Sequence, residues 1–188
     1  MLSRLATVQS ALPIRYQPER RTVAGEVQIF PADYANTAHM AALIDLLDAY
    51  ALDPMGGGHG LSADARTNLP KALRARPQLF SVLAWDDSLG PVGLVNCVEG
   101  FSTFACKPLV NVHDVVVLGT CRGQGLAGRM LELVGDLARE RGACKLTLEV
   151  LSGNASAIKA YRRYGFDNYE LDPAAGQALF MQKWLAPV

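Results

Sequence analysis

Hydrophobic and polar positions along this chain predict strands and helices in a definite order. Strand-like segments, either alternating or continuously apolar, occur at 26–30, 79–85, 92–103, 109–118 and 144–151. Segments with helical spacing cover 33–52, 62–76, 126–141 and 154–164. A last pair of strands is predicted at 166–171 ("FDNYEL") and 178–185 ("ALFMQKWL"). The resulting order, β-α-α-β-β-β-α-β-α-β-β, indicates an α/β fold with one mixed sheet.

The helix predicted at 126–141 has the strongest pattern. One apolar stripe is formed by Ala127, Met130, Leu131, Val134 and Ala138. Gly142 follows as a suitable residue to end this helix. The preceding segment "LVNVHDVVVL" (109–118) is almost continuously apolar, as is typical of a strand buried on both faces. A Gly-rich turn therefore connects a buried strand to an amphipathic helix.

Length and composition limit the function classes. The 188 residues, half of them hydrophobic, suffice for one domain at 25–188 after an N-terminal extension at 1–24. Lys plus Arg equals Asp plus Glu at 18 each, which argues against a dedicated nucleic-acid binder. The four cysteines have no CxxC spacing, so we expect reduced thiols in a cytoplasmic protein. There is no apolar run of membrane-spanning length.

The turn within "TCRGQGLAGRML" (120–131) has the features of an anion site. The first N–H groups of a helix are free, and the helix dipole favours negative charge there. Gly123 and Gly125 allow the backbone to approach a ligand closely. A P-loop is excluded because the turn lacks the Lys and Ser/Thr of that motif. A dinucleotide-binding turn, which would imply an oxidoreductase, and a turn that serves only packing both remain open at this point.

The same residues fit a narrower pattern. Arg122-Gly123-Gln124-Gly125-Leu126-Ala127 resembles the [QR]-x-x-G-x-[GA] signature of the GNAT superfamily of acyl-CoA-dependent N-acyltransferases. Downstream, "KLTLEVLSGNASAIKAYRRYGF" (145–166) is similar to the second conserved block of that family, a strand followed by an Asn that opens a short helix. The resemblance covers 109–166 closely, and the predicted elements before it have the order of the family.

The resemblance implies a site for acetyl-CoA as co-substrate, without a metal. The backbone of Val115, Val116 and Val117 would bind the pantetheine arm. The pyrophosphate would be wrapped by Arg122, Gly123, Gln124, Gly125, Leu126, Ala127 and Gly128. Asn154 and Tyr161, two helical turns apart on one face, would lie beside the cofactor. Tyr161 would act as general acid toward the leaving thiolate, with Tyr164 as a packing residue and second choice.

Acetyl transfer also needs the amine in its neutral form, so a base is expected near the thioester. The candidates are Glu99, His113 and Asp114, on two central strands. Simple alternation would send His113 and Asp114 to opposite faces unless a bulge intervenes. The local sequence has a weak likeness to the diamine and polyamine acetyltransferase branch, from which it departs by carrying His113 at a Glu position. A structural or substrate-orienting role is an equal alternative for all three residues.

We therefore expect an N-acetyltransferase that transfers acetyl to a primary amine by direct attack. A small-molecule amine is the preferred acceptor, on the diamine-branch likeness. The alternatives are a protein N-terminal or lysine acetyltransferase, and a non-catalytic acyl-CoA-binding or sensor module of the same fold. No nucleic-acid or membrane partner is expected. The sequence does not specify the oligomeric state, and a homodimer is one possible assembly because dimers are common in the family. His59, in the loop "DPMGGGHGL" (53–61), is expected to be a solvated residue at the mouth of the acceptor site.

Overall fold

The computed structural model describes residues 26–169, 172, 174, 176 and 178–185. The strands are β1 (Val27–Pro31), β2 (Leu79–Asp86), β3 (Gly90–Ser102), β4 (Lys107–Val117) and β5 (Leu146–Leu148). The helices are α1 (Thr37–Leu52), α2 (Ala63–Arg74), α3 (Leu126–Glu140) and α4 (Ala155–Tyr164), with short 3₁₀ turns η1 (Pro54–Gly56) and η2 (Gly119–Cys121). The predicted N-terminal extension, 1–24, lies outside the described residues.

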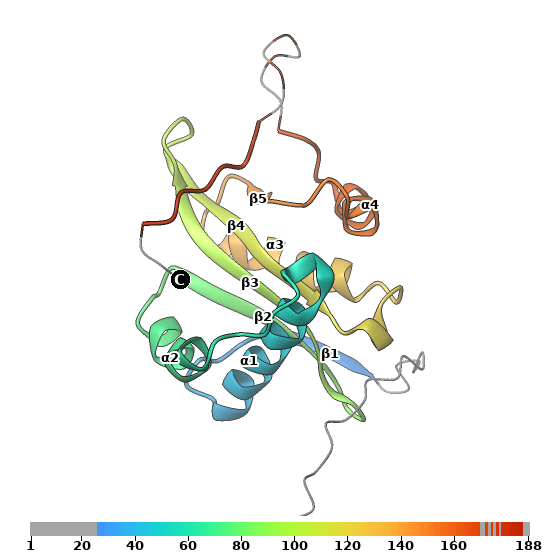
Figure 1. The fold of residues 1–188 in the computed structure, drawn as a ribbon. Helices are drawn as coiled ribbons and strands as arrows, with labels where there is room; N and C mark the ends of the chain where they lie inside the picture. Colours follow the sequence, from blue (N-terminus) through green and yellow to red (C-terminus); the bar gives the residue numbers. More distant parts are fainter. Residues whose placement is uncertain (1–25, 170–171, 173, 175, 177, 186–188) are drawn as a thin grey trace, which may run out of the picture.

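One five-stranded sheet forms the centre of the molecule, in the order β1-β2-β3-β4-β5 (Figure 1). Neighbouring strands are antiparallel except β4 and β5, which are parallel. The α/β prediction with a mixed, mostly antiparallel sheet is thereby confirmed. A parallel pair needs a crossover connection, and α3 supplies it between β4 and β5.

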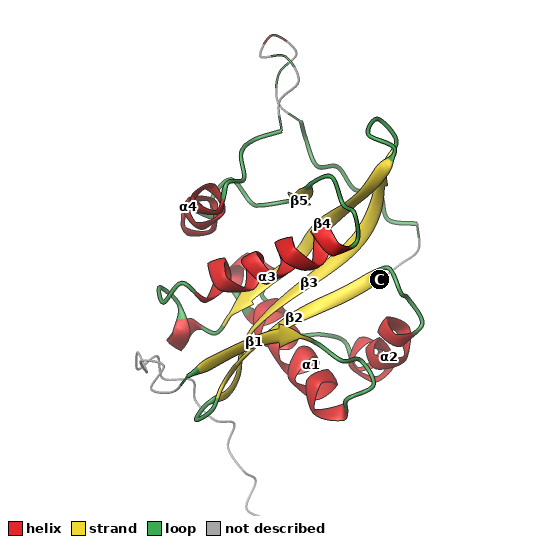
Figure 2. Cartoon of the chain, turned by 180° about the vertical axis from the view of Figure 1, so that it is seen from behind, coloured by secondary structure: helices red, strands yellow, loops and turns green. Residues whose placement is uncertain are grey.

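Helices cover both faces of the sheet. The α1 and α2 side is toward the viewer in Figure 1, whereas α3 lies in front of the sheet in Figure 2. Leu43 and Leu46 of α1 pack with Leu83 and Leu94 of the sheet. On the opposite face, the part of the predicted α3 stripe from Met130 to Ala138 packs in a second cluster that is rich in valine, whereas Ala127 is outside it. The central strands are buried on both faces for this reason, as their continuous apolar character predicts.

The predicted helix at 33–52 begins later than expected. Asp33 does not cap it, because its carboxylate accepts a hydrogen bond from the Ala35 N–H in the preceding turn. Asn36 is the cap residue, and its Oδ1 accepts from the N–H groups of Ala38 and His39. The other predicted helices agree with the structure to within two residues at each end.

The predicted strands at 166–171 and 178–185 are wrong as far as the described residues show. Residues 166–169 and 178–185 belong to no ladder. Phe166 packs against the rings of Tyr161 and Tyr164, so the chain leaves α4 along that helix. In the second segment Leu179, Phe180 and Met181 are exposed. Alternation alone does not make a strand, because the backbone also needs a neighbouring edge to pair with.

Among the described helices, none has both the length and the apolar character that crossing a membrane requires.

Candidate active site

A β-bulge interrupts the pairing of β3 with β4 at the predicted base residues. Asn96 pairs with Asp114 and Cys97 pairs with Val112, so His113 has no partner residue on β3. A bulge inserts one residue and resets the alternation of the strand. His113 and Asp114, which simple alternation would separate, therefore both line one cavity.

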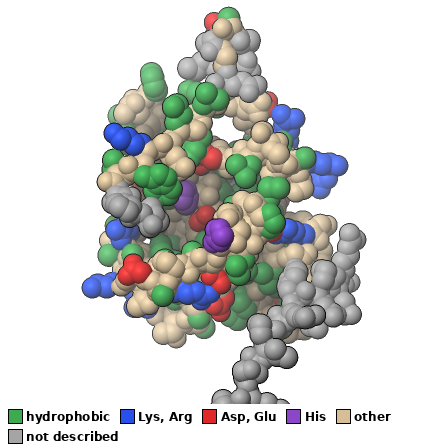
Figure 3. All heavy atoms as spheres, viewed as in Figure 1, with side chains coloured by type: hydrophobic (Ala, Val, Ile, Leu, Met, Phe, Trp, Pro, Cys, Tyr) green, Lys and Arg blue, Asp and Glu red, His purple; other side chains and the backbone are tan. Residues whose placement is uncertain are grey.

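This cavity lies between the sheet and the two N-terminal helices and measures about 160 Å³. Its walls are Leu47, Leu69, Leu73, Leu79 and Val98. Its remaining lining residues are Tyr34, Asn96, Cys97, His113 and Asp114. On the same side of the molecule, the space-filling view shows histidine and acidic side chains among hydrophobic ones (Figure 3).

A chain of hydrogen bonds runs across three strands to Asp114. Asn96 Nδ2 donates to Asp114 Oδ2 at 3.0 Å, and Ser81 Oγ donates to Asn96 Oδ1 at 2.6 Å. Tyr34 Oη lies 2.8 Å from Ser81 Oγ. Since the single hydroxyl proton of Ser81 is used toward Asn96, Tyr34 must be the donor of this bond. Every donor in the chain thus points toward the carboxylate, and this arrangement orients Asp114.

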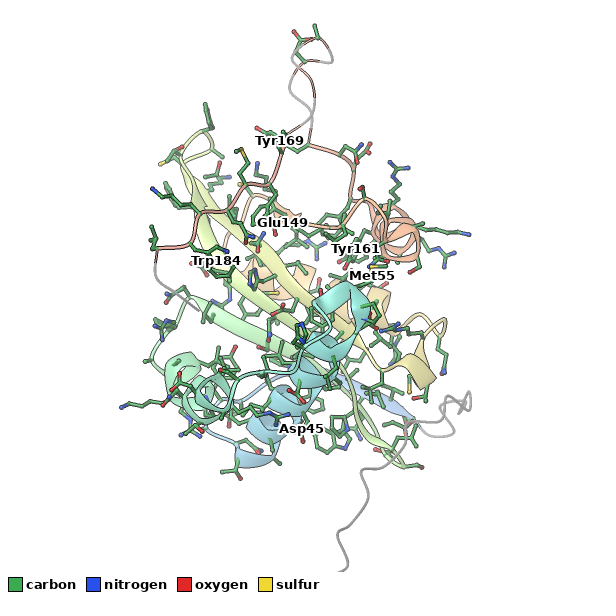
Figure 4. All side chains as sticks on the ribbon, in the orientation of Figure 1. Asp45, Met55, Glu149, Tyr161, Tyr169 and Trp184 are labelled. Carbon is green, nitrogen blue, oxygen red and sulfur yellow. The ribbon has the colours of Figure 1, made fainter. Side chains whose placement is uncertain are left out.

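Tyr161 lies on the side of α4 that faces the sheet (Figure 4). Burial, and secondly the nearby Tyr50 of α1, raise the pKa of Tyr161 to about 12. Burial raises the pKa of Tyr50 as well, with further contributions from the charges of Asp114 and Asp53. Tyr50 is therefore close enough to both Asp114 and Tyr161 to interact electrostatically with each.

The strands β4 and β5 separate just before His113 and Asp114. Their pairing covers only Val110 to Val112 against Leu146 to Leu148. Beyond Val112, no described residue pairs with β4 on the β5 side, and this stretch includes Val115, Val116 and Val117. Unpaired N–H and C=O groups on a strand edge are available to an extended ligand with amide groups of its own.

The Gly-rich turn opens onto α3 without a side-chain cap. Gly125, the N-cap residue, has φ 77° and makes no side-chain cap hydrogen bond. Gly123 has φ 81°, and at Gly123, Gly125 and Gly128 a Cβ would meet nothing within 4 Å. No side chain of Gly125 caps the first N–H groups of α3, and no described atom crowds these three glycines, a fitting arrangement for an anion.

Arg122 is held by the loop that follows α1. Its guanidinium donates to Asp53 Oδ2 at 2.8 Å and to the carbonyl of Val117 at 3.1 Å. The hydrogen bond from Arg122, followed by one from the Met55 N–H, lowers the pKa of Asp53. The side chain predicted to contact the pyrophosphate thus links the Gly-rich turn to the loop 53–61.

Asn154 begins α4 as its N-cap. Its Oδ1 accepts hydrogen bonds from the Ala157 N–H and from Ser156 Oγ, both at 3.1 Å. This accounts for the Asn in the second motif by helix capping, and the capped helix in turn positions Tyr161.

Glu99 does not join the other candidates. It forms a 3.1 Å ion pair with Arg141, whose guanidinium also lies 4.4 Å from the centre of the Phe80 ring. Phe80 belongs to the cluster on the α3 face, whereas Asp114 and its partner Asn96 line the cavity on the α1 and α2 face. Glu99 is three residues beyond Asn96, so the alternation of β3 directs it to the α3 face.

Two further predictions concern single residues. Tyr164 donates a hydrogen bond to the carbonyl of Leu131, which agrees with its expected packing role. His59 is exposed in the loop after α1.

A larger recess of about 620 Å³ lies between α3, β5 and α4. Of the residues that the sequence singled out for the active site, only Tyr164 lines it.

Sequence comparison identifies the family of this chain. The pattern of the Acetyltransferase (GNAT) family matches residues 33–166. The chain belongs to the GNAT acetyltransferase family. The GNAT chain is 34% identical over 125 residues to a streptothricin acetyltransferase of Streptomyces lavendulae, a match that covers 66% of this chain and 57% of that protein. It is also 34% identical over 73 residues to an L-methionine sulfoximine/L-methionine sulfone acetyltransferase of Pseudomonas aeruginosa, with 39% and 41% covered. The chain thus spans about half the length of the curated relatives it matches.

Solved structures share the fold. An aminoglycoside acetyltransferase from a soil metagenomic sample, in complex with sisomicin, superimposes with a TM-score of 0.70 at 16% identity and covers 85% of this chain and 97% of that one. An aminoglycoside N-acetyltransferase in complex with CoA gives a TM-score of 0.66 at 18% identity, with 85% and 96% covered. These likenesses show that the sheet and helices have the GNAT arrangement.

Sequence reasoning missed Tyr34, Tyr50, Ser81 and Asn96. Only Asn96 had a usable signal, as a polar residue inside the apolar run "VGLVNCV" (92–98). A buried polar residue requires a partner, and that requirement could have pointed to the neighbouring strands. The two tyrosines look like ordinary apolar-face residues until the fold brings Tyr34 to the cavity and Tyr50 near Asp114 and Tyr161. Within the described part of the chain, no cluster of three or more His, Cys, Asp or Glu could hold a metal.

Proposed function

We propose that this GNAT domain transfers the acetyl group of acetyl-CoA to the primary amine of a small molecule by direct attack. The bulge at His113 carries the proposal, because it places His113 and Asp114 together in a cavity beside the open edge of β4. A carboxylate next to an acceptor cavity, a phenol that stays protonated at neutral pH and an unpaired strand edge are the parts that such a transfer needs.

The residues that fit acetyl-CoA are those of the open strand edge and the Gly-rich turn. The backbone of Val115 to Val117 would supply hydrogen-bonding groups for the pantetheine amides at the edge of β4 that β5 leaves open, apart from the Val117 carbonyl, which accepts from Arg122. The N–H groups at the start of α3 take the pyrophosphate, since Gly125 caps the helix without a side chain that would compete for them. Arg122 adds a positive charge at the rim of this turn.

Asp114 is the proposed base, with His113 as the alternative on the same bulge. The amine nitrogen forms a bond to the acetyl carbonyl carbon, and its proton passes to the base directly or through water. An amine with a pKa near 10 costs about 4 kcal/mol to hold neutral at pH 7, which is why a base in contact with the acceptor matters. Asn96 holds Asp114 in position for this role.

Tyr161 is the proposed acid. When the carbon–sulfur bond breaks, the thiolate takes the phenol proton or a hydrogen bond from it. With its pKa raised to about 12 by burial and by Tyr50, Tyr161 stays protonated throughout the neutral range. Glu99 is left out of the proposed mechanism, because its carboxylate is paired with Arg141 on the other face of the sheet.

The test is acceptor-dependent release of free CoA from acetyl-CoA by the purified chain. The panel contains alkyl amines, diamines, amino acids, streptothricin, an aminoglycoside, and peptides with a free N-terminus or a lysine. We expect small-molecule amines to raise release well above the rate without acceptor. Release with peptides alone would favour a protein acetyltransferase. Tight acetyl-CoA binding without release for any acceptor would favour a sensor module.

A further inference from the structure

The cavity beneath α1 and α2 carries information about the acceptor. It runs from Asp114 and Asn96 toward Val98 and Leu79, which are partners one alternation step further along the sheet. Residues two apart on one strand face of a sheet are separated by about 6.6 Å. The lining of the cavity thus spans at least one such step along the sheet, with Asp114 at one end.

The walls of the cavity, as far as the structure describes them, are mostly apolar, and they include neither lysine nor arginine. The side chains of Leu47, Leu69 and Leu73 cover it from the helices, and Leu79 and Val98 line its far end. The polar groups of Tyr34 and Asn96 are used in the hydrogen-bond chain to Asp114. None of the ten lining residues, all in the described part of the chain, is lysine or arginine. A charged group at the far end would therefore lose its water without gaining a partner.

We propose that this cavity binds the compact apolar arm of the acceptor, so that the substrate class is primary amines with a short aliphatic substituent. This inference rests on the proposed function. At about 30 Å³ for each water-sized group, 160 Å³ holds an arm of about five non-hydrogen atoms. The amine meets Asp114 and the arm lies against Leu69, Leu79 and Val98. A diamine carries a second cation into apolar walls, and an amino acid carries a carboxylate that no lining cation receives.

A matched series of acceptors tests the walls directly. Pentylamine, 1,5-diaminopentane and 5-aminopentanoate each contain a chain of five carbons, and they end in a methyl, an ammonium and a carboxylate group. We expect kcat/KM for pentylamine to exceed that of the other two by at least about tenfold, because neither charged end finds a partner. Equal values, or a preference for the diamine, would overturn the proposal.

A variant should reverse the preference. Leu69 lies on α2 and is only partly buried, so Leu69→Glu can place a carboxylate at the cavity without opening the core. We expect the kcat/KM ratio of diaminopentane to pentylamine to rise at least about tenfold in this variant. Ala63→Glu is the control, because it adds the same charge at an exposed position of the same helix. An equal change in both variants would contradict the assignment of the cavity.

The proposed acceptor class and the proposed acetyl transfer can be tested separately. Calorimetric titration with pentylamine and diaminopentane measures selectivity of binding without any turnover. If no amine of any class releases CoA, the proposed function is contradicted, and selective pentylamine binding would still support an apolar pocket. If turnover occurs with other amines while pentylamine neither binds nor reacts, the acceptor class is wrong and the acetyltransferase proposal stands. Loss of folding in Leu69→Glu leaves the wild-type series as the deciding measurement.

Discussion

Asn96 donates a hydrogen bond from Nδ2 to Asp114 Oδ2 across the β3–β4 ladder at 3.0 Å. The two residues are direct partners in the register, on the last pair before the bulge. Asn96 in turn accepts from Ser81, which is 1% exposed. The orientation of the proposed base is therefore built into the sheet and does not depend on a loop.

Replacing Asn96 with Leu should lower kcat/KM by about tenfold or more. Hydrogen bonds to charged groups contribute about 1.5–3 kcal/mol, and about 1.4 kcal/mol corresponds to a factor of ten. Steady-state kinetics on wild type and variant at one pH measure the effect. Ser81→Ala is the matched control, since it interrupts the chain one residue earlier and leaves the bond to Asp114 in place. It should reduce the free energy of unfolding by about 1 kcal/mol while kcat/KM changes little. Similar losses of kcat/KM in both variants would count against a specific role for Asn96.

Tyr161→Phe should lower kcat by about tenfold to a hundredfold with little change in the affinity for CoA. The phenol has a pKa of about 12, raised by burial and by Tyr50, so its proton is not lost between pH 7 and pH 10. A kcat profile over this range should therefore show no decline caused by Tyr161. Tyr164→Phe serves as control, because it removes only the hydrogen bond to the Leu131 carbonyl. An unchanged kcat in Tyr161→Phe would remove this residue as the acid.

Gly125→Val should raise the dissociation constant of CoA at least about tenfold. A β-branched residue at φ 77° is strained, and its side chain would occupy the space in front of the α3 N–H groups. Gly142→Val is the control for strain alone, because Gly142 has φ 74° with similar open space at the other end of the helix. Both variants should be destabilised, but only Gly125→Val should lose affinity in a calorimetric titration. Parallel losses of affinity would argue against the anion site.

The pair of Asp53 and Arg122 should make a pH-dependent contribution to stability. The hydrogen bond from Arg122 lowers the pKa of Asp53 in the folded state below its unfolded value, near 3.9. The stabilisation is thus present above about pH 4 and is lost as the pH falls through the folded pKa. Wild type should unfold at a higher temperature than Asp53→Asn at pH 7, and the difference should shrink below about pH 4. A difference that stays constant down to pH 3 would contradict this account.

The four cysteines should divide into two classes. Cys97 and Cys121 are buried, at 1% and 0% exposure, whereas Cys106 and Cys144 are exposed. Burial also raises the pKa of the Cys97 thiol to about 12, so its reactive thiolate is scarce at neutral pH. A thiol reagent at pH 8 should modify two cysteines quickly, and peptide mapping should identify Cys106 and Cys144. Fast modification of Cys97 would contradict the burial of this strand.

Much of the fold could be predicted from the sequence because the local patterns agree with the tertiary packing. The stripe from Ala127 to Ala138 predicts α3, and the glycines before it predict an open helix start, because both depend on neighbours within a few residues. The second motif is equally local, with Asn154 as a cap and Tyr161 two turns later. The last two predicted strands failed for the opposite reason, since pairing requires an edge elsewhere in the chain that the pattern does not specify.

The sequence by itself determined the order of elements through α4, the family signature and the identity of the candidate acid. The tertiary structure decided which polar residues meet. The bulge that brings His113 beside Asp114 exists only in the register of β4 with β3, and one residue of shift there exchanges the faces of the sheet. The same register joins Asn96 to Asp114 and sends Glu99 to Arg141. Such choices depend on residues far apart in sequence, whose pairing is selected by the packing of the whole sheet.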